Sequence, residues 1–314
     1  GKAFRMQRIR AKRPKPGLQR QHLTAVLAAA EVGGALVEGA ALGSQQLTFS
    51  PRHVQPGEYH FRVGTAGSAT LVLQTVLPAL AVASQTSHVV LEGGTHNIYA
   101  PPFDFLHRAL LPLLNRMGPQ VEARLDRPGF FPAGGGRVTV AVTPREQFEP
   151  IELLHRGPIV DCRVRSIVSR LPRHIAEREV ATALDDLSWP RECGIIEEVD
   201  SAGPGNVVLI EIHCEHVTEV FAGFGQRGVP AEKVAGAAAR EARDYLGAGV
   251  PVGEHLADQL LLPLALAGGG RFRTLQPTLH TTTNIATLRQ FLDVGISTEP
   301  IEDGQWEISV ESAK

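Results

Sequence analysis

Hydrophobic and polar positions alternate in short stretches that follow helical ones, and this order recurs along the chain. Each time, a helical stretch ends near a glycine or proline and is followed by an alternating strand, a turn and a second alternating strand. The four copies of helix, strand and strand are residues 23–30, 36–40 and 46–50; 105–117, 120–125 and 137–142; 175–187, 194–199 and 207–214; and 285–292, 296–301 and 305–310. Turns such as Glu302-Asp303-Gly304 favour hairpin pairing of the two strands. The pattern predicts a mixed α+β protein.

A second helix and strand precede two of these copies. They are residues 68–83 with 88–91, and residues 254–267 with 271–275, and a strand at 59–63 opens the first of them. The complete unit is therefore βαβαββ, with its helices covering one face of each sheet. Residues 5–9 are predicted to form a strand with no unit start before it, so we expect that an N-terminal strand and helix are missing from the beginning of this chain.

One copy lies in a segment of different composition. Residues 156–250 contain all three cysteines, and the glycine- and proline-rich residues 247–253 close this segment. We predict an inserted domain over residues 156–250, within a catalytic domain made of residues 1–155 and 251–314.

Charge and cysteine content narrow the class of protein. The 31 basic and 33 acidic residues give a net charge of −2, which excludes a protein that coats nucleic acid through overall positive charge. Three cysteines without Cys-x-x-Cys spacing cannot form a disulfide framework and favour a reducing compartment. The apolar stretches are short and interrupted, and the basic start lacks the pattern of a signal peptide. We predict a cytoplasmic location and no membrane partner.

Positive charge is nevertheless concentrated at the start, where eight lysines and arginines precede the first acid, Glu31. Pro14 and Pro16 exclude a helix here and predict a loop that leads into the first helix. A basic loop ahead of a helix is typical of phosphate binding, because guanidinium groups and free backbone N–H groups act together. A solvated basic turn remains the alternative. The candidate phosphate ligands are Arg10, Arg13, Lys15 and Arg20.

Two further motifs have the spacing of ligand sites. The Gly-x-Gly-x-x-Gly sequence at 223–228 stands between a strand and a helix, but Pro230 intervenes and no acid ends a following strand, so we interpret it as structural rather than dinucleotide-binding. His213-Cys214-Glu215-His216 resembles a metal cluster. On one strand its side chains alternate between two faces and cannot converge on one ion.

The last candidates are polar residues on apolar helices. Gln74 interrupts one such helix, and Asp258 and Gln259 interrupt another. His280 opens the last helix among small polar residues. A helix N-terminus disfavours the imidazolium, so the histidine Nε2 keeps its lone pair at neutral pH and can act as a nucleophile. A capping or surface role for His280 is the alternative.

Taken in order, five segments resemble the RNA 3′-terminal phosphate cyclase family over essentially the whole chain. The most specific of them is Gly-Phe-Phe-Pro-Ala-Gly-Gly-Gly at residues 129–136; the others are residues 13–23, 67–75 and 256–259, and His280. The resemblance implies a large domain of three βαβαββ repeats, shared with enolpyruvyl transferases. It also implies an inserted smaller domain similar to the C-terminal part of translation initiation factor three.

The resemblance further implies a ligase-type reaction that uses ATP and a divalent cation, Mg²⁺ or Mn²⁺. A histidine takes AMP from ATP and passes it to an RNA 3′-phosphate, and the neighbouring 2′-OH displaces AMP to leave a 2′,3′-cyclic phosphate. The resemblance puts this nucleophile on His280. The family also has a glycine-rich segment that we expect before residue 1, and commonly a tyrosine where this chain has His255. The implied ATP contacts are Gln74, Pro101, His255, Leu256, Ala257, Asp258 and Gln259.

Two other functions are alternatives to the cyclase. A cyclase-like ribosome-assembly protein keeps the fold without a catalytic histidine, whereas this chain has His280 together with Asp258 and Gln259. An enolpyruvyl-type transferase needs lysines paired with carboxylates, and lysine is nearly absent after the first loop. The basic loop would serve either the RNA phosphates or the ATP triphosphate. RNA is favoured because the implied ATP contacts lie far along the chain.

Overall fold

The computed structural model describes residues 1–312 and groups the chain into two compact units. The first unit comprises Gly1–Phe103, Pro119–Glu146 and Asp200–Pro204, and the second comprises the remaining described residues. The mixed α+β class predicted from the hydrophobic pattern is confirmed. A catalytic domain with an insert at residues 156–250 stays a prediction.

The first unit contains two sheets, with strand orders β1-β3-β2 and β4-β5-β7-β6. β4 and β5 are parallel, and all other pairs are antiparallel. The predicted hairpins between the short strands at 36–40 and 46–50, and at 120–125 and 137–142, are confirmed. The strands are β1 (Phe4–Gln7), β2 (Leu36–Glu38), β3 (Gln46–Ser50), β4 (Glu58–Arg62), β5 (Ser87–Gly93), β6 (Gln120–Arg127) and β7 (Gly136–Thr143).

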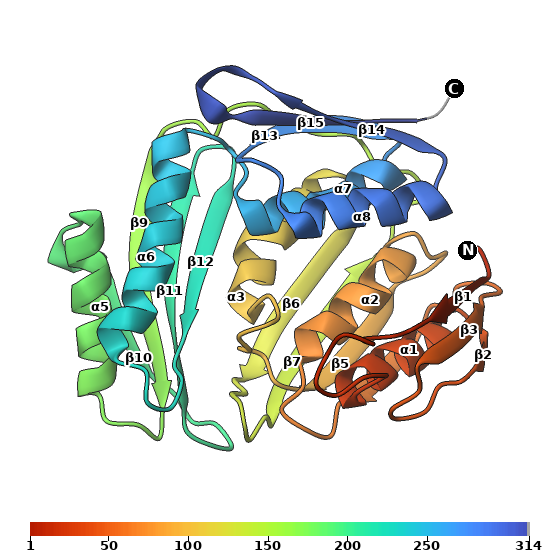
Figure 1. The fold of residues 1–314 in the computed structure, drawn as a ribbon, viewed down its shortest axis with the longest axis horizontal. Coiled ribbons are helices and arrows are strands. Elements are labelled where there is room, and N and C mark those ends of the chain that lie inside the picture. Colours follow the sequence, from red (N-terminus) through yellow and green to blue (C-terminus); the bar gives the residue numbers. More distant parts are fainter. Residues whose placement is uncertain (313–314) are drawn as a thin grey trace. The chain divides into compact units, whose positions relative to one another are not determined.

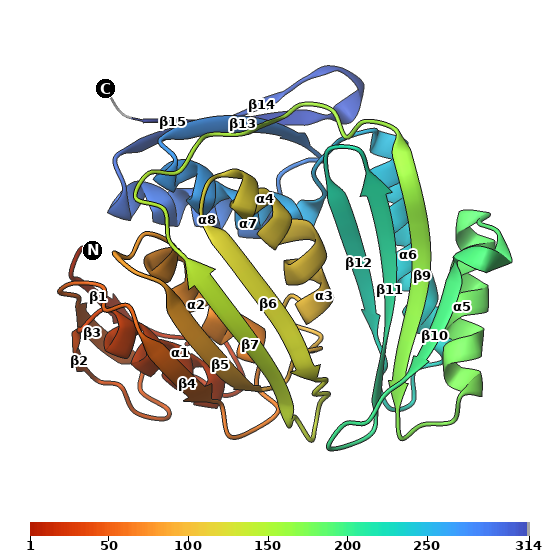
Figure 2. The same ribbon diagram turned by 180° about the vertical axis from the view of Figure 1, so that it is seen from behind.

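Two helices of this unit pack against one another, α1 (Arg20–Val32) and α2 (Ala69–Ala81). α2 also covers one face of the β4-β5-β7-β6 sheet (Figure 1), whose other face is seen in Figure 2. The Ser68 side chain accepts a hydrogen bond from the Leu71 N–H and thereby fixes where α2 begins. Ala69 N–H bonds to Gly94 O at 2.8 Å, so the helix starts beside the end of β5.

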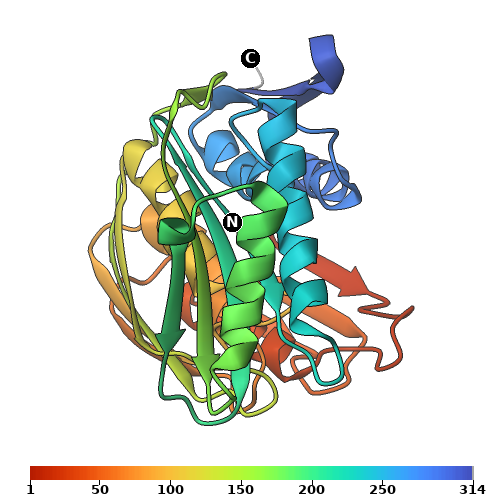
Figure 3. The ribbon, with the colours of Figure 1, turned by 90° about the vertical axis from the view of Figure 1, so that its left-hand side faces the viewer.

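In the second unit, one sheet has the strand order β10-β9-β11-β12. Helices α5 (His174–Leu187) and α6 (Ala231–Ala248) lie side by side on it, green and cyan in Figure 3. The predicted hairpin between residues 194–199 and 207–214 is wrong, because β9 lies between those strands. β10 is parallel to β9 and reaches it through α5, whereas β11 is antiparallel to β9. The strands are β9 (Ile159–Ser169), β10 (Gly194–Glu198), β11 (Gly205–Cys214) and β12 (Thr218–Phe224), with a 3₁₀ turn, η2 (Arg191–Cys193), before β10.

The other sheet of this unit has the order β14-β15-β13-β8, in which β13 and β8 are parallel. Its pairing order is the same as that of β6-β7-β5-β4. The predicted hairpin between 296–301 and 305–310 is confirmed, and α7 packs on this sheet and against α8. The elements are β8 (Glu152–Leu153), α7 (Glu254–Leu266), β13 (Gly269–Thr274), α8 (Leu279–Phe291), β14 (Val294–Pro300), η3 (Glu302–Gly304) and β15 (Trp306–Ser312).

The helix predicted at 105–117 is built from three consecutive pieces. They are α3 (Phe103–Phe105), the π-helical η1 (Leu106–Leu110) and α4 (Leu111–Arg116). π-helical turns are rare and occur frequently at functional sites. Across residues 1–312, none of the helices has the length and apolar character that a membrane crossing requires.

Candidate functional site

His280 is the second residue of α8 and its side chain is exposed. The helix begins there because Thr278 caps it, its Oγ1 accepting the Thr281 N–H at 3.3 Å. Within the described residues, the imidazole forms no hydrogen bond or ion pair with another side chain. The expectation that His280 opens the last helix is therefore confirmed. It stands at a helix N-terminus with both ring nitrogens available to a ligand.

A direct bond joins the start of α8 to α7. Asn284 lies one turn after His280, and its Nδ2 donates to Asp258 Oδ1 at 2.9 Å and to Asp258 O at 3.0 Å. Gln259 Nε2 also donates to the Asp258 carboxylate, at 3.2 Å. The structure therefore brings His280 and the predicted ATP contacts on α7 together, through Asn284. Sequence reasoning missed Asn284, although its spacing of four from His280 was a readable signal.

Not every predicted contact on α7 has a side chain at the surface. Leu256 and Ala257 are 0% and 1% exposed and belong to the core, so only their backbone can meet a nucleotide. His255 is exposed and lies 3.6 Å from a Glu241 carboxylate oxygen, which raises the pKa of His255 against a smaller lowering by partial desolvation of the ring. Asp258 and Gln259 are half-buried.

The position of α7 depends on a buried carboxyl group in β12. Glu219 is 1% exposed, and its Oε1 accepts the N–H of Gly253, the residue before α7, at 2.6 Å. Burial raises the pKa of Glu219 to about 7. Glu179, bonded to Ser166 and Asn206, has its pKa raised to about 7 for the same reason.

These raised pKa values predict how stability depends on pH. A folded-state pKa above the unfolded value means that the folded protein binds more protons between about pH 4.5 and pH 7. The stabilisation is complete below that window and is lost as the pH rises through 7. Glu219→Gln keeps an acceptor for Gly253 and cannot ionise. We expect the wild-type free energy of unfolding to fall by up to about 3 kcal/mol more than that of the variant between pH 5 and pH 8.

Urea denaturation at the two pH values measures this difference. The exposed Glu122 supplies the control, because Glu122→Gln is expected to leave the pH dependence as it is in the wild type. An identical fall in wild type and Glu219→Gln would contradict the assignment of the titration to Glu219.

The basic loop of the first unit occupies residues 8–19 and leads into α1 as predicted. Arg13, Lys15 and Arg20 are exposed. Arg10 is different, because its Nη1 donates to Lys15 O at 2.6 Å and to Gly17 O at 3.3 Å. Arg10 therefore holds the loop in shape, and the other three present their charges to solvent. His22 closes a capping box with Gln19, and its pKa is lowered by burial and by Arg10.

A glycine-rich region lies at the start of α2. Thr95 N–H bonds to Gly129 O at 2.9 Å, and Gly129 N–H returns to Thr95 Oγ1 at 2.9 Å, so residues 94–97 and 129–136 are locked together. Gly134 has a φ of +69°, and a Cβ there would lie 2.8 Å from Thr65 O, so only glycine fits. Gln74, on α2, and Pro101, after residues 94–97, are both half-buried in this unit.

Behind the helices of the second unit lies a buried charge network around Arg165 of β9. Its Nη1 donates to Asp104 Oδ1 at 2.8 Å and to Glu211 Oε1 at 2.6 Å, while its Nε donates to Glu197 at 2.9 Å. Arg108 approaches the same Glu211 oxygen at 3.3 Å. Sequence reasoning gave no role to Arg165. Its partners come from three segments that are distant in the sequence.

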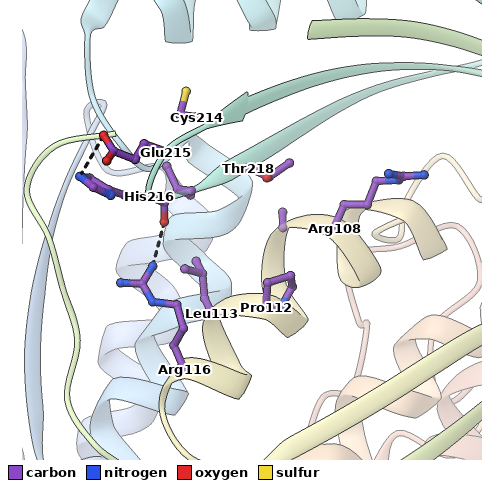
Figure 4. A pocket seen from close by; sticks show the side chains of 10 residues that line it. Arg108, Pro112, Leu113, Arg116, Cys214, Glu215, His216 and Thr218 are labelled. Atoms are coloured by element: carbon purple, nitrogen blue, oxygen red, sulfur yellow. Dashed lines mark hydrogen bonds and ion pairs between the residues drawn. The ribbon is translucent and has the colours of Figure 1, made fainter. Parts of the chain in front are cut away.

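The motif His213-Cys214-Glu215-His216 flanks a cavity of about 150 Å³ between α4 and the β11–β12 turn (Figure 4). Arg116 Nη1 donates to His216 O at 2.8 Å, and His216 lies 3.8 Å from a Glu215 carboxylate oxygen. No three histidine, cysteine or carboxylate side chains among the described residues are grouped to hold a metal ion.

The Gly-x-Gly-x-x-Gly motif starts inside β12, which is antiparallel to β11. A Cβ at Gly225 would lie 1.8 Å from Asn206 Oδ1. These glycines therefore allow close packing within the sheet edge, in agreement with the structural interpretation.

Comparison with known proteins identifies the family. Residues 1–298 match the family model described as RNA 3′-terminal phosphate cyclase. A protein of that name from Koribacter versatilis is 53% identical over 94% of this chain and 83% of its own length, and one from Ectopseudomonas mendocina is 53% identical over 94% and 87%. Another, from Salmonella enteritidis, is 48% identical over 97% of this chain and 89% of its own length. The chain belongs to the RNA 3′-terminal phosphate cyclase family of enzymes.

Proposed function

We propose that this protein uses ATP to convert an RNA 3′-phosphate into a 2′,3′-cyclic phosphate, with His280 as the nucleophile that carries AMP. The observation that supports this most is the exposed imidazole at the start of α8, one turn from the Asn284–Asp258 contact. The family membership of the chain supports the substrate class. The predicted RNA ligands all lie in the first compact unit, whereas the predicted ATP contacts fall in both units, with Gln74 and Pro101 in the first and residues 255–259 in the second. The proposal assigns His280 and α7 to the nucleotide.

The reaction proceeds in three transfers. His280 Nε2 attacks the α-phosphorus of ATP, and pyrophosphate leaves. An oxygen of the RNA 3′-phosphate then attacks the AMP phosphorus, and the histidine leaves with its lone pair restored. Finally the 2′-OH attacks the 3′-phosphorus, loses its proton, and expels AMP. The helix N-terminus disfavours the protonated ring before attack and stabilises the negative charge of the bound phosphate afterwards.

Asp258 and Asn284 act by holding the two helices in register. Asn284 donates to both the carboxylate and the backbone carbonyl of Asp258, so a shift of α8 along α7 would break both bonds. Asp258 retains acceptor capacity for a nucleotide amino group. A divalent cation would bind chiefly through the ATP phosphates, as Mg²⁺ commonly does with one or two protein carboxylates, and would supply positive charge to the leaving pyrophosphate.

The predicted domain division also forms part of the proposal. Residues 1–155 and 251–314 form the catalytic domain with its repeats, and residues 156–250 form the insert. The identical pairing order of the two four-stranded sheets, β4-β5-β7-β6 and β8-β13-β15-β14, supports a repeated unit. A cytoplasmic location is proposed from the three unpaired cysteines.

Incubation with ATP labelled at the α-phosphate and a divalent cation tests the function directly. A phosphoramidate on histidine is expected to give protein-bound label that is labile in acid and stable in base. The label must then pass to an RNA 3′-phosphate and leave a cyclic end. A protein that binds such RNA without taking label would support the non-catalytic assembly role instead.

The basic loop predicts a separable effect on RNA. Arg13→Ala is expected to raise the KM for 3′-phosphorylated RNA by about tenfold, because one charge-assisted contact to a phosphate is lost. The slope of log KM against log salt should also flatten by about 0.7. Labelling of the protein with AMP should change much less, because we assign this loop to RNA rather than to the ATP triphosphate.

Arg52→Ala is the matched control for this experiment, since Arg52 is exposed in the same unit and lies outside the loop. It is expected to have little effect on the KM for RNA. Equal losses of AMP labelling and RNA use in Arg13→Ala would count against an RNA-specific role and assign the loop to the triphosphate.

A further inference from the structure

Two aromatic side chains of the first unit are left in solvent. Tyr99 is 89% exposed and Phe131 is 74% exposed, and among the described residues they are the only aromatics on the exposed surface. Aromatic residues make up only 5% of this chain and are its most effective core-forming residues, so two of them left unburied call for an explanation. Neighbouring rings are used for packing: Phe130 is 3% exposed and stacks on the buried His96 at 5.4 Å.

The segments that carry the two rings are fixed to each other. His96 and Phe130 form an isolated β-bridge, and Gly134 N–H bonds to Phe130 O at 2.7 Å. Ala100 N–H donates to Asn97 O at 3.1 Å, and this bond closes the turn that carries the exposed Tyr99. Both exposed rings are therefore held by short, internally bonded loops.

The same region is joined to the start of α1, which follows the basic loop. Asn97 Nδ2 donates to Ala66 O at 2.7 Å, and two residues later Ser68 N–H donates to Gln21 Oε1 at 3.1 Å. Gln21 directly follows the exposed Arg20. One turn, residues 66–68, thus contacts both the Tyr99 segment and the beginning of α1.

Two acids of the β4-β5-β7-β6 sheet are already neutralised by arginines of the same sheet. Glu92 is paired with Arg62 and Arg137, and Asp126 is paired with Arg124 and Arg137. Arg13, Lys15 and Arg20 have no acidic partner within the described residues. Exposed rings in the same compact unit as an exposed cationic segment match single-stranded nucleic acid, in which bases stack and phosphates pair with cations.

We propose that Tyr99 and Phe131 form a stacking platform for bases of the RNA substrate that precede its phosphorylated 3′ end. This inference rests on the proposed function and extends it, because it assigns a base-binding subsite apart from the reacting phosphate. Stacking tolerates any base, so the platform gives affinity for an unpaired end without selecting a sequence.

Cyclisation of 3′-phosphorylated oligoribonucleotides tests the platform. Each substrate carries one abasic nucleotide, at successive positions upstream of the 3′ end. For the wild type, an abasic site at the position over the platform should raise KM about tenfold, equivalent to about 1.4 kcal/mol, with kcat little changed. Phe131→Leu keeps an apolar side chain without a ring, and it should show the raised KM on intact RNA with no further rise on the abasic RNA. Phe131→Tyr should restore the wild-type pattern.

Tyr99→Leu is expected to behave as Phe131→Leu does. Leu27→Ala is the control, because it removes an exposed apolar side chain elsewhere in this unit and should leave the KM for RNA unchanged. Independent, additive effects of the abasic site and the ring substitutions would overturn the platform. So would a higher KM for ATP in protein labelling, which would assign the rings to adenine. Loss of self-association in sedimentation with an unchanged KM for RNA would assign them to a contact between copies.

The proposed function is checked separately in this experiment. If wild-type protein neither takes label from ATP nor cyclises intact RNA, the function fails while the platform remains testable. Fluorescence anisotropy with the same intact and abasic oligonucleotides would then decide the platform. Equal affinity of the wild type for all of them would overturn it.

Discussion

Replacing His280 with alanine is expected to abolish covalent capture of AMP, leaving no detectable label on the protein. No other described side chain is proposed to attack the α-phosphorus, and a methyl group cannot replace the ring nitrogen. His280 is exposed and makes no side-chain contact that the fold needs, so the variant should unfold at the same urea concentration as the wild type. His280→Asn should be equally inactive, because an amide nitrogen is not a nucleophile.

His174→Ala is the matched control for this prediction. His174 is also exposed, and it is the first residue of α5 in the same unit. Its replacement should leave labelling with AMP unaffected. Full labelling of folded His280→Ala would disprove the assignment of the nucleophile, whatever the variant does to RNA.

Arg165→Met is expected to lower the free energy of unfolding by about 3 to 5 kcal/mol, the largest stability effect predicted for this chain. The substitution keeps most of the side-chain volume but removes the closer of the two cations that Asp104 and Glu211 share, and leaves only Arg108, at 4.0 Å and 3.3 Å from them. Asp104 is 6% exposed and Glu211 0% exposed, so water cannot take the place of the guanidinium. The cost therefore comes from desolvated carboxylates rather than from lost packing.

Two comparisons separate this effect from a general loss of charge. Arg163 lies two residues earlier in β9, is exposed and, within the described part of the chain, pairs only with Asp161, so Arg163→Met should cost less than about 1 kcal/mol. Replacing Asp104 and Glu211 by Asn and Gln in the Arg165→Met background should recover much of the stability. Urea denaturation measures all of these variants, and equal costs for Arg163→Met and Arg165→Met would contradict the network argument.

Most of the secondary structure followed from local pattern. Alternation with turn residues between strands predicted four hairpins, and three are confirmed, including the one formed by β14 and β15. The predicted hairpin within 194–214 is wrong because β9, which the pattern did not predict, lies between its two strands. Arg165 and Ser166 occupy buried positions in that strand, so its polar residues hide the periodicity of a buried strand. Partners that are distant in the sequence satisfy both residues: three carboxylates bind Arg165, and Glu179 accepts a hydrogen bond from Ser166.

The sequence alone determined the class of the fold, the family resemblance, and the place of His280 at a helix start, because capping and alternation are properties of neighbouring residues. Tertiary structure decided which candidate side chains are accessible. It buried Leu256 and Ala257, turned Arg10 inward to the carbonyls of its own loop, and joined Asn284 to Asp258. It also placed Tyr99 and Phe131 at the surface of the first unit. Burial and hydrogen bonding depend on residues distant in the chain, which no local pattern records.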